Sequence, residues 1–140
     1  MAEKFRTSDF KKVVTEGRKP PNCDETLNIH INSASDGVAV SSWQIDERYL
    51  NGVGVVMGGF VSSAADITMA YALASLLEDN QTFASLNLHT TFHRPVFAGE
   101  ALVTATVERM GNKIAYLVCD VKQNGKNAAN IVSSVMILEA

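Results

Sequence analysis

The sequence predicts an α+β fold in which an antiparallel sheet wraps around one long central helix. Residues 58–77 place apolar side chains at three- and four-residue steps and contain one charge, Asp66, which indicates a helix buried on most of its sides. Residues 27–43 and most of 86–138 instead alternate between apolar and polar side chains, which is the period of half-buried strands. Because an apolar helix has to be enclosed, we expect the sheet to curl around it.

A short helix is expected ahead of the sheet. Phe10 and Val13 follow helical spacing, Thr7 or Ser8 is available as the cap, and Gly17 is a natural stop. The Lys-Pro-Pro-Asn stretch at 19–22 cannot continue a helix and leads into the first strand.

The alternation predicts six strands, at 27–32, 38–43, 86–92, 101–107, 114–121 and 128–138. Asn124-Gly125 is a strong signal for a two-residue hairpin, and further turns are expected at Asp36-Gly37 and Gly111-Asn112. No repeat, linker or low-complexity stretch interrupts the sequence. We therefore expect a single domain over residues 1–140, of which 1–22 form the N-terminal helix and lead-in.

The composition excludes several classes of function. The 140 residues are 46% hydrophobic and 19% charged with a net charge of −3, so no basic surface for nucleic acid is expected. The first 16 residues lack the apolar core of a secretory signal, which predicts a cytoplasmic protein with Cys23 and Cys119 as free thiols. The stretch 52–77 is long enough to span a membrane, but its glycines and serines and Asp66 favour a helix inside a folded domain.

Asp66 is the most informative residue, because burying a carboxylate in an apolar helix is costly unless the charge is paired or used. An ordinary partner, such as a backbone group, is one explanation. Catalysis is the other, because the glycine-rich stretch 51–59 opens the same helix, and free amides at a helix start suit a developing oxyanion. Gly58 and Asp66 lie roughly 12 Å apart along one helix. A site that uses both therefore requires two antiparallel copies of the helix, and hence a homodimer.

The motif around this helix resembles a known family. The segment 51–59, Asn-Gly-x-Gly-x-x-x-Gly-Gly, with Asp66 seven residues further on and Ala-Tyr-Ala at 70–72, is similar to the hotdog-fold acyl-CoA thioesterases of the phenylacetyl-CoA thioesterase (PaaI-like) group. The Phe-His-Arg-Pro segment at 92–95 is similar to a strand of that family that ends in Arg-Pro. The resemblance implies a hotdog fold and hydrolysis of the thioester bond of an aryl- or medium-chain acyl-CoA.

Carried over position by position, the resemblance implies that Asp66 is the general base or the nucleophile and that the Gly58 amide polarises the thioester carbonyl. Asn51 would orient the carbonyl or the attacking water, and Ser85 matches a position that holds the water in some relatives. The residues implied for substrate binding are Met57, Gly59, Phe60 and Arg94. The chain departs from the family at Met57 and Val53, positions where relatives often have histidine.

Other residues give weaker indications of function. His89 and His93 share one face of a strand but have no third ligand, so no metal is expected. Arg94 and Lys113 are candidates to meet the phosphates of coenzyme A. Phe60, Met69 and Tyr71 line an acyl pocket or pack in the core.

We therefore expect a cytoplasmic acyl-CoA thioesterase that acts as a homodimer, or as a dimer of dimers, without cofactor, membrane or nucleic acid. Coenzyme A is part of its substrate. The alternative is a hotdog protein that binds an acyl-CoA without catalysis, an alternative motivated by Met57, which cannot transfer a proton. A hotdog dehydratase would need a histidine beside the helix start, and the sequence has none there.

Overall fold

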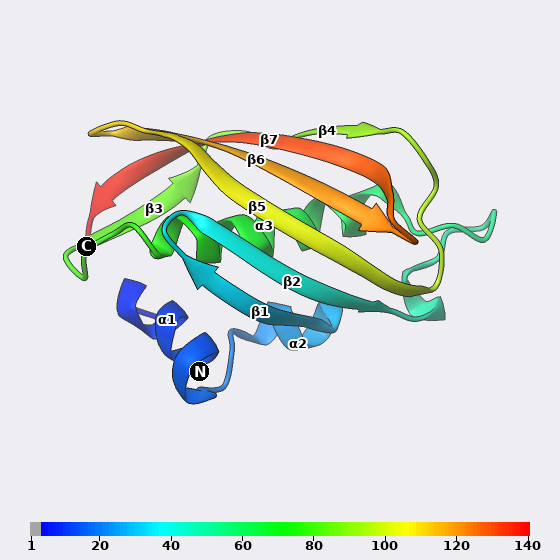
Figure 1. Ribbon diagram of the computed structural model, residues 1–140, viewed down its shortest axis with the longest axis horizontal. Helices are drawn as coiled ribbons and strands as arrows, with labels where there is room; N and C mark the ends of the chain where they lie inside the picture. Colours follow the sequence, from blue (N-terminus) through cyan, green and yellow to red (C-terminus); the bar gives the residue numbers. More distant parts are fainter. Residues whose placement is uncertain (1–3) are drawn as a thin grey trace.

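The computed structural model describes residues 4–140, so residues 1–3 of the predicted lead-in lie outside the described residues. Its strands form one antiparallel sheet in the order β1-β2-β5-β6-β7-β3, and β4 also pairs with β7. The sheet curls around α3, and α1 and α2 lie together on one side of it (Figure 1). The elements are α1 (Thr7–Glu16), α2 (Asn22–Leu27), β1 (Ile29–Ser35), β2 (Val38–Ile45), the short 3₁₀ helix η1 (Glu47–Tyr49), α3 (Gly58–Ala74), β3 (Gln81–Ser85), β4 (His89–Phe92), β5 (Gly99–Met110), β6 (Ile114–Gln123) and β7 (Lys126–Glu139).

Small residues on α3 let the sheet approach the helix closely. Ala64, Ala65 and Ala72 have no exposed surface, and the facing strand residues are equally buried. The polar groups that enter this core are paired, as buried polar groups must be. The hydroxyls of Ser41 on β2 and Thr68 on α3, for example, lie 2.7 Å apart.

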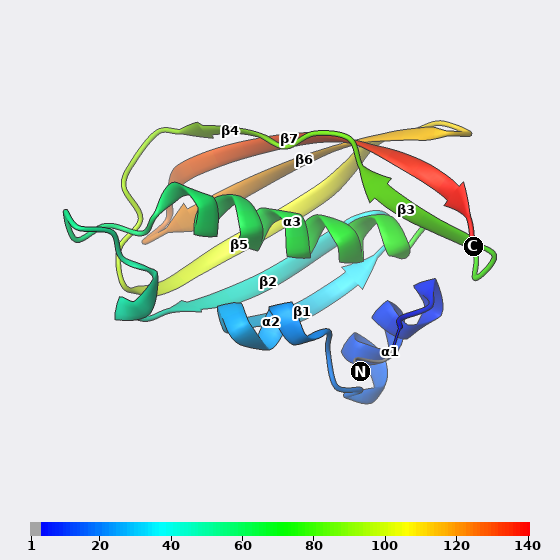
Figure 2. The ribbon, with the colours of Figure 1, turned by 180° about the vertical axis from the view of Figure 1, so that it is seen from behind.

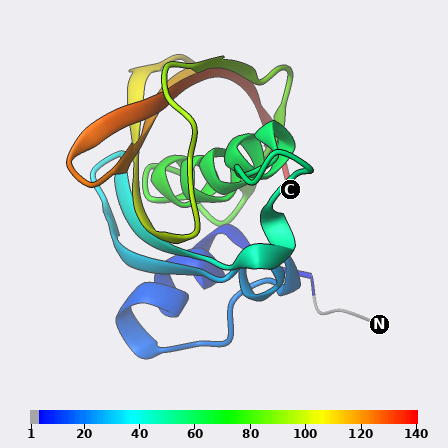
Figure 3. The same ribbon diagram turned by 90° about the vertical axis from the view of Figure 1, so that its right-hand side faces the viewer.

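One stripe of α3 is not covered by the sheet. Gly59, Ser63 and Asp66 are exposed, and the helix is seen uncovered between β3–β4 on one flank and α1–α2 on the other (Figure 2). Viewed along its axis, α3 is enclosed by the curled sheet on one side only (Figure 3). The prediction of a helix buried on nearly every side is therefore wrong for this stripe, because one curled sheet encloses only part of a cylinder.

The helices differ from the prediction in two places. Residues 22–27 form α2, although the strand was expected from residue 27; the helix starts after Pro21 and ends at Asn28, whose φ of 61° breaks it. The central helix ends at Ala74 rather than 77, and the amides of Leu76 and Leu77 bond instead to the carbonyls three residues back, those of Leu73 and Ala74. None of the helices in residues 4–140 is long and apolar enough to cross a membrane.

Of the strand predicted at 86–92 only His89–Phe92 forms a strand, β4, and the strand before it, β3 (Gln81–Ser85), was not predicted; both pair with β7. Asn87 makes the break. Its side-chain oxygen accepts from the Ser134 amide at 3.0 Å, and its backbone oxygen accepts from the Ser133 hydroxyl at 2.7 Å. The first of these bonds occupies the Ser134 amide, a backbone group that would otherwise be free to pair with a continuous strand.

The turns largely follow the prediction. Asn124 and Gly125 join β6 to β7 with φ values of 53° and 75°, as a two-residue hairpin requires. Asp36-Gly37 does the same between β1 and β2. The turn at Gly111 differs, because neither it nor Asn112 has a positive φ. Glycine is needed there for close approach, since a Cβ would lie 2.7 Å from the Ile114 carbonyl oxygen.

The N-terminal helices are fixed to α3 and to the segment that follows it. The Thr7 hydroxyl donates to the Gln81 carbonyl at 2.5 Å, and Ser8 bonds the Asp79 carboxylate through its amide and its hydroxyl. Neither Thr7 nor Ser8 is the cap of α1, which begins after Arg6. The Tyr71 hydroxyl donates to Asp24 on α2 at 2.6 Å, and burial raises the pKa of both groups. This bond anchors α2, because Asp24 is only 1% exposed.

Replacing Tyr71 with phenylalanine tests this anchor. The substitution leaves a buried carboxylate oxygen without its donor, and we expect the free energy of unfolding to fall by about 1–3 kcal/mol. Urea denaturation measures the change. Tyr116→Phe is the matched control, because Tyr116 is 39% exposed on β6, and it should alter stability by less than about 0.5 kcal/mol. Equal effects of the two substitutions would show that the bond does not anchor α2.

Candidate active site

The loop before α3 is shaped by Asn51. Its side-chain oxygen accepts from the amides of Val53 and Val55 at 3.0 and 3.3 Å, and its own amide donates to the Val55 carbonyl at 2.7 Å. These bonds fold residues 51–55 into a tight turn ahead of the helix. Within residues 4–140 the side-chain NH₂ of Asn51 has no acceptor, so it remains available to a ligand.

The first turn of α3 presents free amides. Gly58 and Gly59 are its first two residues, and the first intrahelical acceptor, the Met57 carbonyl, pairs with the Phe60 amide at 2.9 Å. The amides of Gly58 and Gly59 therefore have no acceptor among the described residues. Together with the positive end of the helix dipole, they form a site where negative charge is stabilised.

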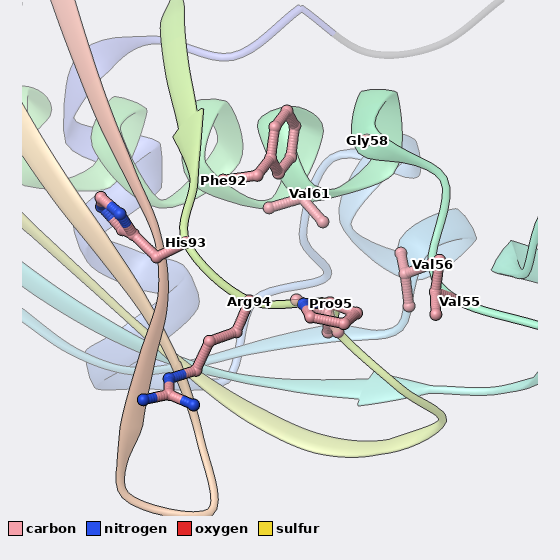
Figure 4. Close-up of a pocket in the computed structure, with 9 residues that line it drawn as sticks. Val55, Val56, Gly58, Val61, Phe92, His93, Arg94 and Pro95 are labelled. Atoms are coloured by element: carbon pink, nitrogen blue, oxygen red, sulfur yellow. The ribbon is translucent and has the colours of Figure 1, made fainter.

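Gly58 lines a cavity of about 450 Å³ between the start of α3 and β4. The Phe92 ring points toward the helix start in this cavity, whereas His93 and Arg94 point away from it (Figure 4). A Cβ on residue 58 would lie 2.8 Å from the tip of the Phe92 ring. A larger residue at this position therefore requires the Phe92 ring to move.

Asp66 lies two turns further along α3, on the open stripe. It lines a second cavity, of about 330 Å³, together with Ser85 at the end of β3. Its carboxylate makes no hydrogen bond or ion pair anywhere in residues 4–140. The ordinary structural partner that would have explained a carboxylate on this helix is therefore not seen. Partial burial against the apolar surroundings raises the pKa of Asp66 above its usual value.

The two cavities share no lining residue. The structure brings Asp66 together with Ser85, and it places Gly58 in a separate cavity with Arg94. This is the separation that the helix geometry predicts for two residues eight positions apart. A single chain thus holds a candidate base and a candidate oxyanion site, but not at one reaction centre.

The other residues predicted to contact the substrate lie in different environments. Met57 is 47% exposed, and its methyl group lies over Gly59. Phe60 packs against the ring of Tyr49, with ring centres 5.2 Å apart, and lines neither cavity. Met69 is buried in the core.

Two basic residues lie close together near the Gly58 cavity. Arg94 lines that cavity and also an adjoining cavity of about 270 Å³, which reaches Lys126 after the β6–β7 turn. Lys113, the other candidate for the phosphates, lies on the β5–β6 turn at the opposite end of the sheet, so within one chain it does not lie near Arg94 (Figure 1). The Asn124-Gly125 hairpin signal could have indicated Lys126. This residue directly follows the turn, so it lies at the end of the sheet where β6 meets β7, beside Arg94.

The histidines and cysteines form no metal site in the described part of the chain. No group of three His, Cys, Asp or Glu side chains converges within residues 4–140. His93 instead shares a 2.6 Å hydrogen bond with Asn130 on β7. Both cysteines are free thiols as predicted, with Cys23 exposed and Cys119 buried.

An antiparallel sheet curled around one long central helix defines a hotdog fold, which confirms the predicted architecture. The sequence model of the thioesterase superfamily matches residues 53–129, which contain Gly58, Asp66, Ser85 and Arg94. The chain therefore belongs to the thioesterase superfamily and is a thioester hydrolase.

Individual relatives agree with this assignment. The chain is 35% identical over 111 residues to the acyl-coenzyme A thioesterase PaaI of Escherichia coli K12, an alignment that covers 76% of each chain. It is 27% identical over 124 residues to human acyl-coenzyme A thioesterase 13, covering 86% of this chain and 88% of the human protein. A solved structure of a phenylacetic acid degradation-related protein from Ralstonia eutropha JMP134 superposes with a TM-score of 0.85 at 29% identity, covering 91% of this chain and 98% of that one.

Proposed function

We propose that this protein hydrolyses the thioester bond of an acyl-CoA with an aryl or medium-chain acyl group, at sites shared between two copies of the chain. The observation that carries the proposal is Asp66, a carboxylate without a partner in the described structure, on the open stripe of the central helix. Such a group is free to act on a ligand. The similarity to acyl-coenzyme A thioesterases supports the choice of substrate.

The shared site follows from the separation of Asp66 and Gly58. The open stripe of α3 carries the small side chains of Gly59 and Ser63, which would allow a second helix to approach closely. In an antiparallel pair of α3 helices about a two-fold axis, Asp66 of each chain would face Gly58 of the other. A homodimer of this kind contains two equivalent sites, and two dimers would form the tetramer.

Asp66 is proposed to act as a general base. It takes a proton from a water held near Ser85 and the partner's Asn51, and the water oxygen bonds to the thioester carbonyl carbon. The partner's Gly58 amide stabilises the negative charge that develops on the carbonyl oxygen. The carbon–sulfur bond then breaks, the acid is released, and the coenzyme A thiolate takes the proton from Asp66, which returns to its carboxylate form.

The Gly58 cavity is the proposed route for coenzyme A. Its lining is largely apolar, which suits the pantetheine arm, and it leads past Arg94 to Lys126. Two cations at the outer end suit the phosphates of coenzyme A. Met57 and Gly59 would contact the substrate at the helix start, where Met57 replaces the family's histidine without affecting the Gly58 amide.

We propose that the reaction needs no metal and no cofactor, and that it takes place in the cytoplasm. A thioester has a good leaving group, so a positioned water and an oxyanion donor suffice for its hydrolysis. The free thiols of Cys23 and Cys119 suit a reducing compartment.

Substituting Asp66 tests the proposed base. Asp66→Asn keeps the shape of the side chain but cannot accept a proton, and we expect kcat on phenylacetyl-CoA to fall at least about 100-fold. The working form is the carboxylate, so the parent should lose activity as pH falls through the pKa of Asp66. Because burial raises this pKa, the midpoint should lie above the usual value of about 3.9. Free-thiol release measures both; unchanged turnover by Asp66→Asn would exclude the base.

Removing the Gly58 amide tests the oxyanion site. Proline is tolerated at the first position of a helix and has no N–H, and the extended Met57 backbone suits a following proline. The Phe92 ring would clash with the new side chain, so the test compares Gly58→Pro with Gly58→Ala, both in a Phe92→Ala background. We expect kcat to be about 100- to 1,000-fold lower with proline. Equal rates for the two double variants would show that the amide has no catalytic role.

A further inference from the structure

Two contacts join the first turns of α3 to the short strand β4. The Phe92 ring lies over Gly58, with its tip 2.8 Å from the point where a Cβ on residue 58 would stand (Figure 4). One turn further along the helix, the hydroxyls of Ser62 and Thr90 lie 2.7 Å apart. Residues four apart share a face of a helix, and residues two apart share a face of a strand. The two contacts therefore lie one after the other between the same face of α3 and the same face of β4.

The Phe92 ring is not part of the hydrophobic core. It is 52% exposed, whereas Val61 and Val96, which line the same cavity, are almost completely buried. A ring that keeps half of its surface in water gains only part of the stabilisation that burial gives. Packing alone therefore does not account for its position over the free amide of Gly58.

We propose that Phe92 covers the oxyanion site and that the Ser62–Thr90 hydrogen bond holds it there. The inference rests on the proposed function, because it takes the Gly58 amide as the donor to the carbonyl oxygen. A donor stabilises developing charge far better where water is excluded than where water surrounds it. The ring shields one side of the helix start, and the pantetheine arm of the substrate, lying against the ring, shields the other.

The Ser62 hydroxyl is used differently from that of its neighbour. Ser63 donates to the Gly59 carbonyl of the same helix at 2.8 Å, which is the usual bond of a helical serine. Ser62 instead bonds across to β4. A hydrogen bond of this length fixes the separation of its two partners closely, and Thr90 lies only two residues before Phe92. Ser62 and Thr90 therefore act as positioning residues for the ring.

The outer end of the coenzyme A route is fixed by other bonds. The amides of His93 and Arg94 both donate to the Ala128 carbonyl, at 2.8 and 3.0 Å. This attachment to β7 does not involve Ser62 or Thr90. Loss of the Ser62–Thr90 bond should therefore disturb the cover of the Gly58 amide while leaving Arg94 in place for the phosphates. The proposal thus predicts an effect on kcat rather than on KM.

Thr90→Val tests the positioning bond, because valine keeps the shape of threonine but has no hydroxyl. We expect kcat on phenylacetyl-CoA to fall about five- to tenfold, as the loss of one hydrogen bond allows, with KM changed by less than about twofold. Thr91→Val is the matched control, since Thr91 is exposed on the opposite face of β4, and it should change neither constant. An unchanged kcat in Thr90→Val, or the same loss in Thr91→Val, would overturn the proposal.

Combined variants separate positioning from a merely structural role. Ser62→Ala together with Thr90→Val should lower kcat no further than either alone, because each removes the same bond. Phe92→Ala should lower kcat about tenfold, less than the loss of the donor itself, and Phe92→Leu should restore most of it. In the Phe92→Ala protein, Thr90→Val should have no further effect, since the bond then has no ring to position. A full additional loss there would show that the bond acts on something other than Phe92.

The same measurements distinguish this proposal from the proposed function. A parent protein that hydrolyses no acyl-CoA would overturn both. A parent whose rate depends on Asp66 and on the Gly58 amide, but is unchanged by Thr90→Val and Phe92→Ala, would confirm the proposed function and overturn the cover alone.

Discussion

The structure depends on one constraint: α3 has to be packed tightly by the sheet while one of its sides stays open for a carboxylate. Ala64, Ala65 and Ala72 meet the first requirement, since their small side chains let the curled sheet reach the helix backbone. Asp66 imposes the second, because an unpaired carboxylate facing the sheet would have to be stripped of water. The flanking elements stop short of this open stripe. β3 and β4 lie along one border of it, and α1 and α2 lie along the other (Figure 2).

This arrangement divides the chemistry along the helix. The helix start supplies free amides, and the middle of the helix supplies the carboxylate, each beside its own cavity. A second copy of the chain supplies what the first lacks at each place, so that Asp66 of one chain and the proposed coenzyme A route of the other meet at the thioester. The open stripe thus has two consequences, namely access for the substrate and a surface for the partner.

Patterns of local sequence predicted the scaffold well. The spacing of apolar residues gave the start of α3, and Asn124-Gly125 gave the β6–β7 hairpin. The break between β3 and β4 was not predictable, because it depends on Asn87 bonding to residues of β7 that are 46 and 47 positions away. The open stripe was missed for a similar reason, since apolar periodicity shows which residues can be buried but not how far a sheet extends around them.

The candidate site, like the fold, was predicted only in part. Asp66, Ser85 and the Gly58 amide were indicated by residue type and by the family motif, and the structure places the first two in one cavity. Of the two N-terminal helices, α1 was predicted from its apolar spacing, whereas α2 was not, because it is short and directly follows two prolines. Its position depends on the contact of Asp24 with Tyr71, 47 positions away.

The central claim, that each site uses Asp66 of one chain and Gly58 of another, is tested most directly by mixing two inactive proteins. One carries Asp66→Ala and the other carries Gly58→Pro with Phe92→Ala. After unfolding and refolding together, half of the dimers should be mixed, and each mixed dimer should hold one site with an intact Asp66 and an intact Gly58. We expect the mixture to recover about a quarter of the activity of the unsubstituted protein, because the intact site takes Gly58 and Phe92 from the chain in which neither is replaced. A mixture that contains mixed dimers but remains as inactive as its components would contradict a site shared between chains.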